Sequence, residues 1–420
     1  MKYKGIGMIF TLLLAGCSMN LPKNKIDLIE MKSNVVINEV NLSSILDKLN
    51  DLENKSNIDT VPLCILHIGD SHVQMGHFSN TIRKGLQEEF GGSELGVFFP
   101  YILCGGYNPA GMALSTTSQW KCATNSKPDS TIQVGVTGAT AQTVDSITQI
   151  EFAFKGFERI KTVKLYHQKL NSEFEIRCEG AQITTIDTNS QTAFTTITLP
   201  TEAASINVEI VKINSGEQHF SLYGVSMNQL KSTGIDYHTF GVSGNQYKFY
   251  ETLSPLFEEQ LKDLNPDLLI ISLGSNDAYR KDIDSIQYQN LIVNFVESLR
   301  KISPKTSFII TFPPDTKYKN ERPDSEKTVL NSIRFAANKT QISAWDFHTL
   351  MGGFESNPKW QKIDLANKDG LHLTNDGYQI EGELFNIALA KALKKKYPTS
   401  TWLGKTENSY RNQVLKYKLF

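Results

Sequence analysis

Four short polar clusters contain the residue types that acyl transfer requires. They lie far apart along the chain: Gly69-Asp70-Ser71-His72, Gly244-Asn245, Gly274-Ser275-Asn276-Asp277 and Asp369-Gly370-Leu371-His372. Acyl transfer needs a nucleophile, a base, a group that orients the base, and hydrogen-bond donors for the oxyanion. Each cluster alone is a common kind of turn, so its meaning depends on whether the fold brings the four together.

The first and last clusters suit nucleophilic catalysis. Ser71 follows an apolar run and could present its hydroxyl and its backbone N–H to one ester carbonyl. His372 would take the serine proton and later return it to the leaving alcohol. Asp369, three residues earlier, can reach the other imidazole nitrogen and so hold the ring in one tautomer and orientation.

A metal-dependent alternative fits less well. Asp70 and His72 match the start of a metallophosphoesterase pattern, and the asparagine cluster is faintly similar to a later block of it. That pattern needs more histidines, ending in Gly-His-x-His, to hold two metal ions. The sequence lacks this ending, and it lacks His-Glu-x-x-His, Cys-x-x-Cys, Gly-x-Ser-x-Gly, a P-loop and Gly-x-Gly-x-x-Gly. We therefore expect no catalytic metal and no cofactor.

Alternating strands and helices must position these clusters. Short runs rich in Ile and Leu precede several of them, and helical segments lie between the runs. This order indicates a parallel sheet covered on both faces, with its chemistry at the carboxyl ends of the strands. We expect strands at 63–68, 237–240, 268–273, 307–312 and 342–346. We expect helices at about 42–52, 78–90, 247–264, 285–302, 325–338 and 376–395.

A different pattern separates the serine cluster from the glycine cluster. From about 110 to 230, apolar and polar residues alternate, and serine and threonine are dense. The alternation is clear at 132–136, 163–165, 174–178 and 206–210. Short alternating strands with polar turns indicate a β-sandwich. Because strands and helices alternate again beyond it, we expect this domain to be inserted into the first.

The order of the four clusters resembles that of the SGNH (GDSL-type) hydrolase family. The serine, glycine, asparagine and Asp-x-x-His blocks occur in similar strand contexts, over about 61–103 and 231–397. The resemblance implies a flavodoxin-like three-layer α/β/α domain with a parallel sheet. We accordingly divide this part of the chain into a hydrolase domain at 61–109 and 231–397 and an inserted β-sandwich at 110–230.

The same resemblance assigns roles to individual residues. It implies a serine esterase whose catalytic triad is Ser71, His372 and Asp369. It also implies an oxyanion hole formed by the N–H of Ser71, the N–H of Gly244 and the side-chain amide of Asn276, and each such donor typically lowers the barrier by about 3 kcal/mol.

The first residues of the chain suggest export. Lys2 and Lys4 precede an apolar run at 6–14, and Leu14-Ala15-Gly16-Cys17 resembles a bacterial lipobox. The resemblance implies a signal peptide at 1–16, lipidation of Cys17 and a tether with a lead-in helix at 17–60. We expect a lipid-anchored cell-envelope protein, at the outer membrane and facing the periplasm. An ordinary secretory signal is the alternative.

The insert position resembles that of the bacterial peptidoglycan O-acetylesterases, which carry a carbohydrate-binding-like module there. Tyr107, Trp120 and Tyr166 could stack on sugar rings or belong to the core. The expected partner is an O-acetylated glycan, peptidoglycan first. Acetylated xylan or another polysaccharide, acetyl transfer to a glycan, a lysophospholipase and a glycan-binding lipoprotein without activity are the alternatives.

The composition argues against a nucleic-acid partner and against a fold held together by disulfides. The 420 residues carry 43 basic and 44 acidic side chains, so the formal charge of −1 does not favour nucleic acid as a partner. Five cysteines are too few for a disulfide scaffold. Cys104 and Cys122 could pair in an oxidising compartment or remain free thiols. We assign no role to the tail at 398–420.

Overall fold

The computed structural model describes residues 28–55, 61–92, 95–155, 159–214, 216, 219–228 and 233–416. The expected signal peptide, Cys17 and the first part of the tether lie outside the described residues, so the lipid anchor stays a prediction. Within the described ranges, no helix combines the length and the apolar composition needed to cross a membrane.

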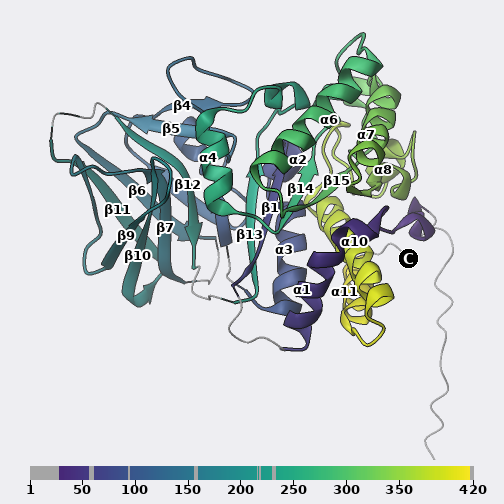
Figure 1. Ribbon diagram of the computed structural model, residues 1–420, viewed down its shortest axis with the longest axis horizontal. Helices are drawn as coiled ribbons and strands as arrows, with labels where there is room; N and C mark the ends of the chain where they lie inside the picture. Colours follow the sequence, from purple (N-terminus) through teal and green to yellow (C-terminus); the bar gives the residue numbers. More distant parts are fainter. Residues whose placement is uncertain are drawn as a thin grey trace, which may run out of the picture.

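Two sheets form the framework of the molecule (Figure 1). The larger has the strand order β16-β15-β14-β1-β13-β2-β12-β7-β10-β9, with β5 beside β12 and β4 beside β5. The smaller has the order β3-β6-β11-β8. The strands are β1 (Leu63–Gly69), β2 (Leu95–Phe98), β3 (Met112–Thr116), β4 (Lys121–Thr124), β5 (Ala139–Thr143), β6 (Ile147–Phe154), β7 (Ile160–Gln168), β8 (Phe174–Arg177), β9 (Gln182–Asp187), β10 (Thr192–Ala203), β11 (Ser205–Lys212), β12 (Phe220–Met227), β13 (Ile235–Gly241), β14 (Leu268–Ser272), β15 (Ser307–Thr311) and β16 (Ser343–Trp345).

Helices cover both faces of the parallel part of the large sheet. They are α1 (Ser43–Glu53), α2 (Ser71–Gln74), α3 (His77–Phe90), α4 (Pro255–Leu264), α5 (Ser275–Ala278), α6 (Ser285–Ile302), α7 (Glu326–Thr340), α8 (Phe347–Leu350), α9 (Asn357–Gln361), α10 (Asn375–Lys396) and α11 (Trp402–Lys416). Short 3₁₀ turns lie at Met31–Ser33, Glu39–Leu42, Tyr101–Cys104, Tyr247–Tyr250 and Tyr318–Asn320.

The side chains of successive residues of β1 pack on opposite faces of the sheet, in two separate hydrophobic cores. Ile65 packs in the core shared with α1, α3 and α10, whereas Leu66 packs in the core shared with α4, α6 and α7. A strand buried on both faces in this way is typical of a three-layer α/β/α domain. Full burial of each such aliphatic side chain contributes about 1.5–3 kcal/mol. The predicted fold class of this domain is confirmed.

The strand register brings three of the polar clusters to one edge. In the parallel pairs of β1 with β13 and β14, Gly69 lies opposite Gly241 and opposite Ser272. The serine, glycine and asparagine clusters therefore begin at the same level, just beyond the carboxyl ends of neighbouring strands.

The single helix predicted at 247–264 is wrong. A 3₁₀ turn at Tyr247–Tyr250 is followed by a separate helix, α4, with Pro255 in its first turn. The Ser254 hydroxyl accepts a hydrogen bond from the Phe257 N–H at 3.0 Å and caps this helix. Proline is favoured at the start of a helix and disfavoured inside one, so the helix begins there.

The β-rich part of the chain forms a sandwich, at the left in Figure 1. Strands of the small sheet share an apolar core with β5, β7, β10 and β12 of the large sheet. One side of the sandwich is thus a continuation of the parallel sheet, joined through β2, where Phe98 pairs with both Thr239 and Val225. The predicted domain boundary at 109/110 stays a prediction.

The strand predicted at 132–136 is also wrong. This segment is a loop held by side chains of the α4 region. The Gln260 side chain accepts a hydrogen bond from the Val136 N–H at 2.8 Å, and the Ser254 hydroxyl donates to the Val134 carbonyl at 2.7 Å. Tertiary contacts satisfy the backbone groups that a strand neighbour would otherwise satisfy.

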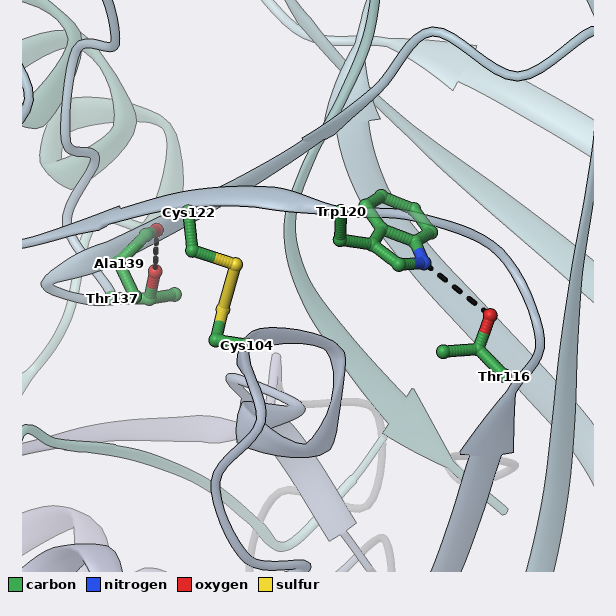
Figure 2. Close-up of a disulfide and its surroundings, with 6 residues drawn as sticks. All are labelled: Cys104, Thr116, Trp120, Cys122, Thr137 and Ala139. Atoms are coloured by element: carbon green, nitrogen blue, oxygen red, sulfur yellow. Dashed lines mark hydrogen bonds between the residues drawn. A yellow bond between two sulfur atoms is a disulfide. The ribbon is translucent and has the colours of Figure 1, made fainter.

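A disulfide joins Cys104 to Cys122 (Figure 2), an alternative that the sequence left open. Cys104 ends a 3₁₀ turn after β2, and Cys122 lies in β4. The bond therefore links β4 of the sandwich to the segment that follows β2. Near it, Trp120 donates its indole N–H to the Thr116 hydroxyl at 3.3 Å.

The tail contains a helix, α11, for which we predicted no element. Its first residue, Trp402, is buried and meets Phe90 of α3 at 4.9 Å between ring centroids. The tail thus packs on the same core as α3 and α10.

Candidate active site

Ser71 is the first residue of α2, immediately beyond β1. The carboxylate of Asp70 caps this short helix by accepting the His72 N–H at 3.0 Å. The chain turns here in a confined space, because a Cβ on Gly69 would lie 2.2 Å from the Val73 side chain. These contacts hold the serine in a sharp turn at the edge of the sheet.

The predicted triad residues lie in hydrogen-bond contact. His372 Nε2 is 3.0 Å from Ser71 Oγ, and His372 Nδ1 is 2.8 Å from Asp369 Oδ2. The other carboxylate oxygen of Asp369 accepts the backbone N–H groups of Leu371 and His372 at 2.9 and 3.0 Å. This geometry allows His372 to accept the serine proton while Asp369 fixes the ring.

The pKa of Asp369 lies below its ordinary value. Partial burial raises this pKa, but the hydrogen bonds from the His372 ring and from the backbone N–H groups outweigh that effect. The carboxylate therefore stays charged near neutral pH, where it can stabilise a protonated imidazole.

The two predicted oxyanion donors flank this triad. Gly244 adopts φ of +77°, which favours glycine, and its nearest non-neighbouring side chain is that of Ser126. The Asn276 amide donates to the Asn245 carbonyl at 3.1 Å and to Asp70 Oδ2 at 3.3 Å. Asn276 is thus held beside the residue that precedes Ser71, and its role as a donor to an oxyanion stays a prediction.

Asn245 connects the strand ends, a role that we did not predict. Its side-chain amide donates to the Gly69 carbonyl at 3.1 Å and to the Tyr250 hydroxyl at 2.8 Å. It therefore joins the end of β1 to the segment after β13. A polar residue beside a glycine is an ordinary turn in sequence, so only the packing reveals this contact.

Buried carboxyl groups underlie the site. Burial raises the pKa of Asp70 to about 7, with a further contribution from the charge of Asp277. Burial also raises the pKa of Asp277 to about 7, and it raises the pKa of Glu381 well above its ordinary value. All three are less than 5 % exposed.

The other histidines near the site are structural. His72 is buried, and its Nδ1 lies 2.8 Å from the Tyr378 hydroxyl, with its ring 5.4 Å from that of His372. Burial, and then the nearby charge of His372, lower the pKa of His72 to about 3, so it stays neutral. His67 is also buried, between the hydroxyls of Tyr237 and Ser272.

The sandwich contributes a loop to the edge of the site. The Ser126 hydroxyl, just after β4, donates to the Ser243 carbonyl at 2.7 Å, next to Gly244. Of the three aromatic residues considered for sugar stacking, Tyr107 is exposed and Trp120 is partly exposed. Tyr166 is buried against Phe194 at 4.2 Å, so its stacking on a sugar is excluded.

A polar groove lies between the sandwich and α4. Its volume is about 500 Å³. Its lining is rich in amide, hydroxyl and charged groups, and includes Gln133, Gln142, Gln168, Tyr223 and Glu259.

Part of the chain matches a known protein family. Residues 219–380 match the GDSL-like lipase/acylhydrolase family. This range contains Gly244, Asn276, Asp369 and His372, while Ser71 lies outside it and reaches them through the pairing of β1 with β13 and β14. No curated protein matches the chain.

Among solved structures, one described as a peptidoglycan O-acetylesterase in action is similar over 83 % of this chain and 96 % of its own, with a TM-score of 0.69 and 22 % identity. This similarity shows a shared fold. A family two carbohydrate esterase from Cellvibrio japonicus matches over 67 % of this chain and 98 % of its own, at 9 % identity and a TM-score of 0.30.

Proposed function

We propose that this chain, which carries a GDSL-like acylhydrolase domain and is a carboxylic ester hydrolase, removes O-acetyl groups from a cell-envelope glycan, most simply peptidoglycan. The observation that carries the proposal is the contact of Ser71, His372 and Asp369 at the edge of the sheet. Ser71 would attack the acetyl carbonyl, and His372 would take its proton and return it to the sugar hydroxyl.

In the same proposal, three donors stabilise the oxyanion of the intermediate. These are the N–H groups of Ser71 and Gly244 and the side-chain amide of Asn276. No hydrogen bond from either N–H is found among the described residues, whereas the Asn276 amide would exchange one of its bonds to Asn245 or Asp70 for the oxyanion. Water would then attack the acetyl-serine, with His372 as base, and release acetate.

Two features support a glycan as the substrate. The sandwich places Ser126 beside the site, and the polar groove next to α4 suits hydroxyl-rich sugars better than acyl chains. The expected lipid anchor at Cys17 would keep the enzyme near envelope polymers, at the outer membrane and facing the periplasm.

The test is acetate release from O-acetylated peptidoglycan, with wild type beside Ser71→Ala and acetylated xylan in parallel. We expect release from peptidoglycan and a loss of at least about 1,000-fold in the variant, because the nucleophile is gone. Release from xylan alone would keep the mechanism and change the polymer. Equal release by wild type and Ser71→Ala would contradict the mechanism.

A further inference from the structure

A second polar cluster lies outside the triad and has no part in the proposed reaction. Asp315 follows β15, Glu326 begins α7 and His348 lies in α8. The three are buried, with exposed fractions of 1, 4 and 5 %. They come from separate segments of the chain, and the fold brings them together.

One atom from each residue points into a shared space. Asp315 Oδ1, Glu326 Oε1 and His348 Nε2 lie within 4.8 Å of one another. None of these atoms has a hydrogen-bond partner among the described residues. Unpaired buried carboxylate oxygens are costly, so a cationic or donating group is expected at this point.

Arg322 does not supply that group. Its Nη1 lies 3.1 Å from the other oxygen of Glu326 and 3.6 Å from Asp315 Oδ1, and its Nη2 lies 2.8 Å from Glu355. The Arg322 guanidinium therefore lies within ion-pair distance of three carboxylates, but it donates hydrogen bonds only to Glu326 Oε2 and to Glu355. Arg322 thus lies at the edge of the cluster but donates no hydrogen bond to Asp315 Oδ1 or Glu326 Oε1, and His348 Nε2 lies 3.7 Å from Glu326 Oε1.

We propose that Asp315, Glu326 and His348 bind a divalent transition-metal ion, with Zn²⁺ as the best candidate. Two carboxylate oxygens and one imidazole nitrogen form a ligand set that suits zinc, with a fourth position for water. Mg²⁺ and Ca²⁺ prefer ligand sets made only of oxygen, so the imidazole disfavours them.

Bound there, the ion would support the catalytic loop from a position outside the triad. The Lys317 N–H, two residues after Asp315, donates to the Gly370 carbonyl at 2.6 Å. The Tyr279 hydroxyl, just beyond α5, donates to Thr316 at 3.0 Å. The segment held by the ion thus contacts both the loop that carries Asp369 and the element that carries Asn276.

The test is zinc binding to the full chain after chelation, measured by calorimetry and by metal analysis, with Mg²⁺ and Ca²⁺ as separate arms. We expect one zinc ion per chain, a higher Tm with zinc, and no comparable effect of the other cations. His348→Gln should weaken zinc binding by more than about 10-fold and abolish the rise in Tm. His219→Gln, a histidine outside the cluster, should behave as wild type.

A second variant keeps the proposal testable if His348→Gln fails to fold. Arg322→Met removes the competing cation and keeps all three ligands, so zinc should bind it at least as tightly as it binds wild type. No zinc binding to wild type, or equal binding to wild type and folded His348→Gln, would overturn the proposal. Esterase activity enters none of these readouts, so failure here is distinct from failure of the proposed function.

Discussion

At the scale of single residues, the site depends on burial as much as on residue type. The residues of the proposed triad could be selected from the sequence because their types and order are specific, and the structure brings them into contact. The buried layer beneath them could not be selected in this way, because Asp70 and Asp277 look like ordinary turn residues in sequence. Their exposed fractions of 1 and 0 % are properties of the packed sheet edge.

The raised pKa of Asp277 predicts a dependence of stability on pH. In the unfolded chain this carboxyl ionises near its ordinary value of 3.8, whereas in the folded chain it keeps its proton until about pH 7. The unfolded state therefore binds fewer protons between these values, and the free energy of unfolding falls as pH rises from about 4 to about 7.

Asp277→Asn should lessen this fall, because the amide cannot ionise, while Asp70, whose pKa is also about 7, keeps its own contribution. The amide oxygen can still accept the Tyr247 N–H. Urea unfolding at pH 4.5 and pH 7.5 measures the effect. Exposed Asp324→Asn is the control and should keep the wild-type difference between the two pH values. An unchanged difference in Asp277→Asn would show that this carboxyl is not the cause.

At the scale of elements, the catalytic loop depends on close backbone packing. Gly370 lies between Asp369 and His372 with φ of +71°, and a Cβ there would be 2.0 Å from the Lys317 carbonyl oxygen. Gly180 has φ of +69° with no atom within 4 Å of the same position. The two glycines share the backbone conformation and differ only in the contact.

Gly370→Ala should therefore lower kcat by at least about 10-fold, since a displacement of the loop by a fraction of an ångström misplaces His372. Gly180→Ala should leave kcat unchanged and lower stability by only about 1 kcal/mol. Kinetics on a small acetyl ester, together with thermal unfolding, separate the two effects. Normal kcat in Gly370→Ala would mean that the loop adapts without moving His372.

The elements themselves were largely predictable. The strands before the polar clusters and the helices at α1, α3, α6, α7 and α10 follow the expected patterns. The strand expected at 132–136 is absent because side chains of another segment hold its backbone, as Gln260 holds Val136. The helix expected at 247–264 is divided because Pro255 begins a separate helix. Helix α11 was missed because its stability depends on the burial of Trp402 against α3.

At the scale of the whole molecule, the sandwich and the hydrolase domain share a sheet. The pairing of β2 with both β13 and β12 makes one continuous framework. Sequence patterns indicate where strands occur but not that strands of two domains pair, because that depends on contacts between distant segments. The sandwich is therefore placed firmly next to the site, with Ser126 at Gly244.

This arrangement predicts that the groove beside α4 contributes to the binding of polymeric substrates and not to the binding of small esters. Gln142→Ala with Glu259→Ala should raise KM for an O-acetylated glycan about 3- to 10-fold, the effect of one or two lost hydrogen bonds. The kcat/KM for a small acetyl ester should not change, because that substrate does not extend from the triad into the groove. Gln149→Ala with Asn207→Ala, on the exposed face of the small sheet, is the matched control and should alter neither value. An equal loss of kcat/KM on the polymer and on the small ester would indicate damage to the catalytic site. No loss of kcat/KM on either substrate would show that the groove does not bind substrate.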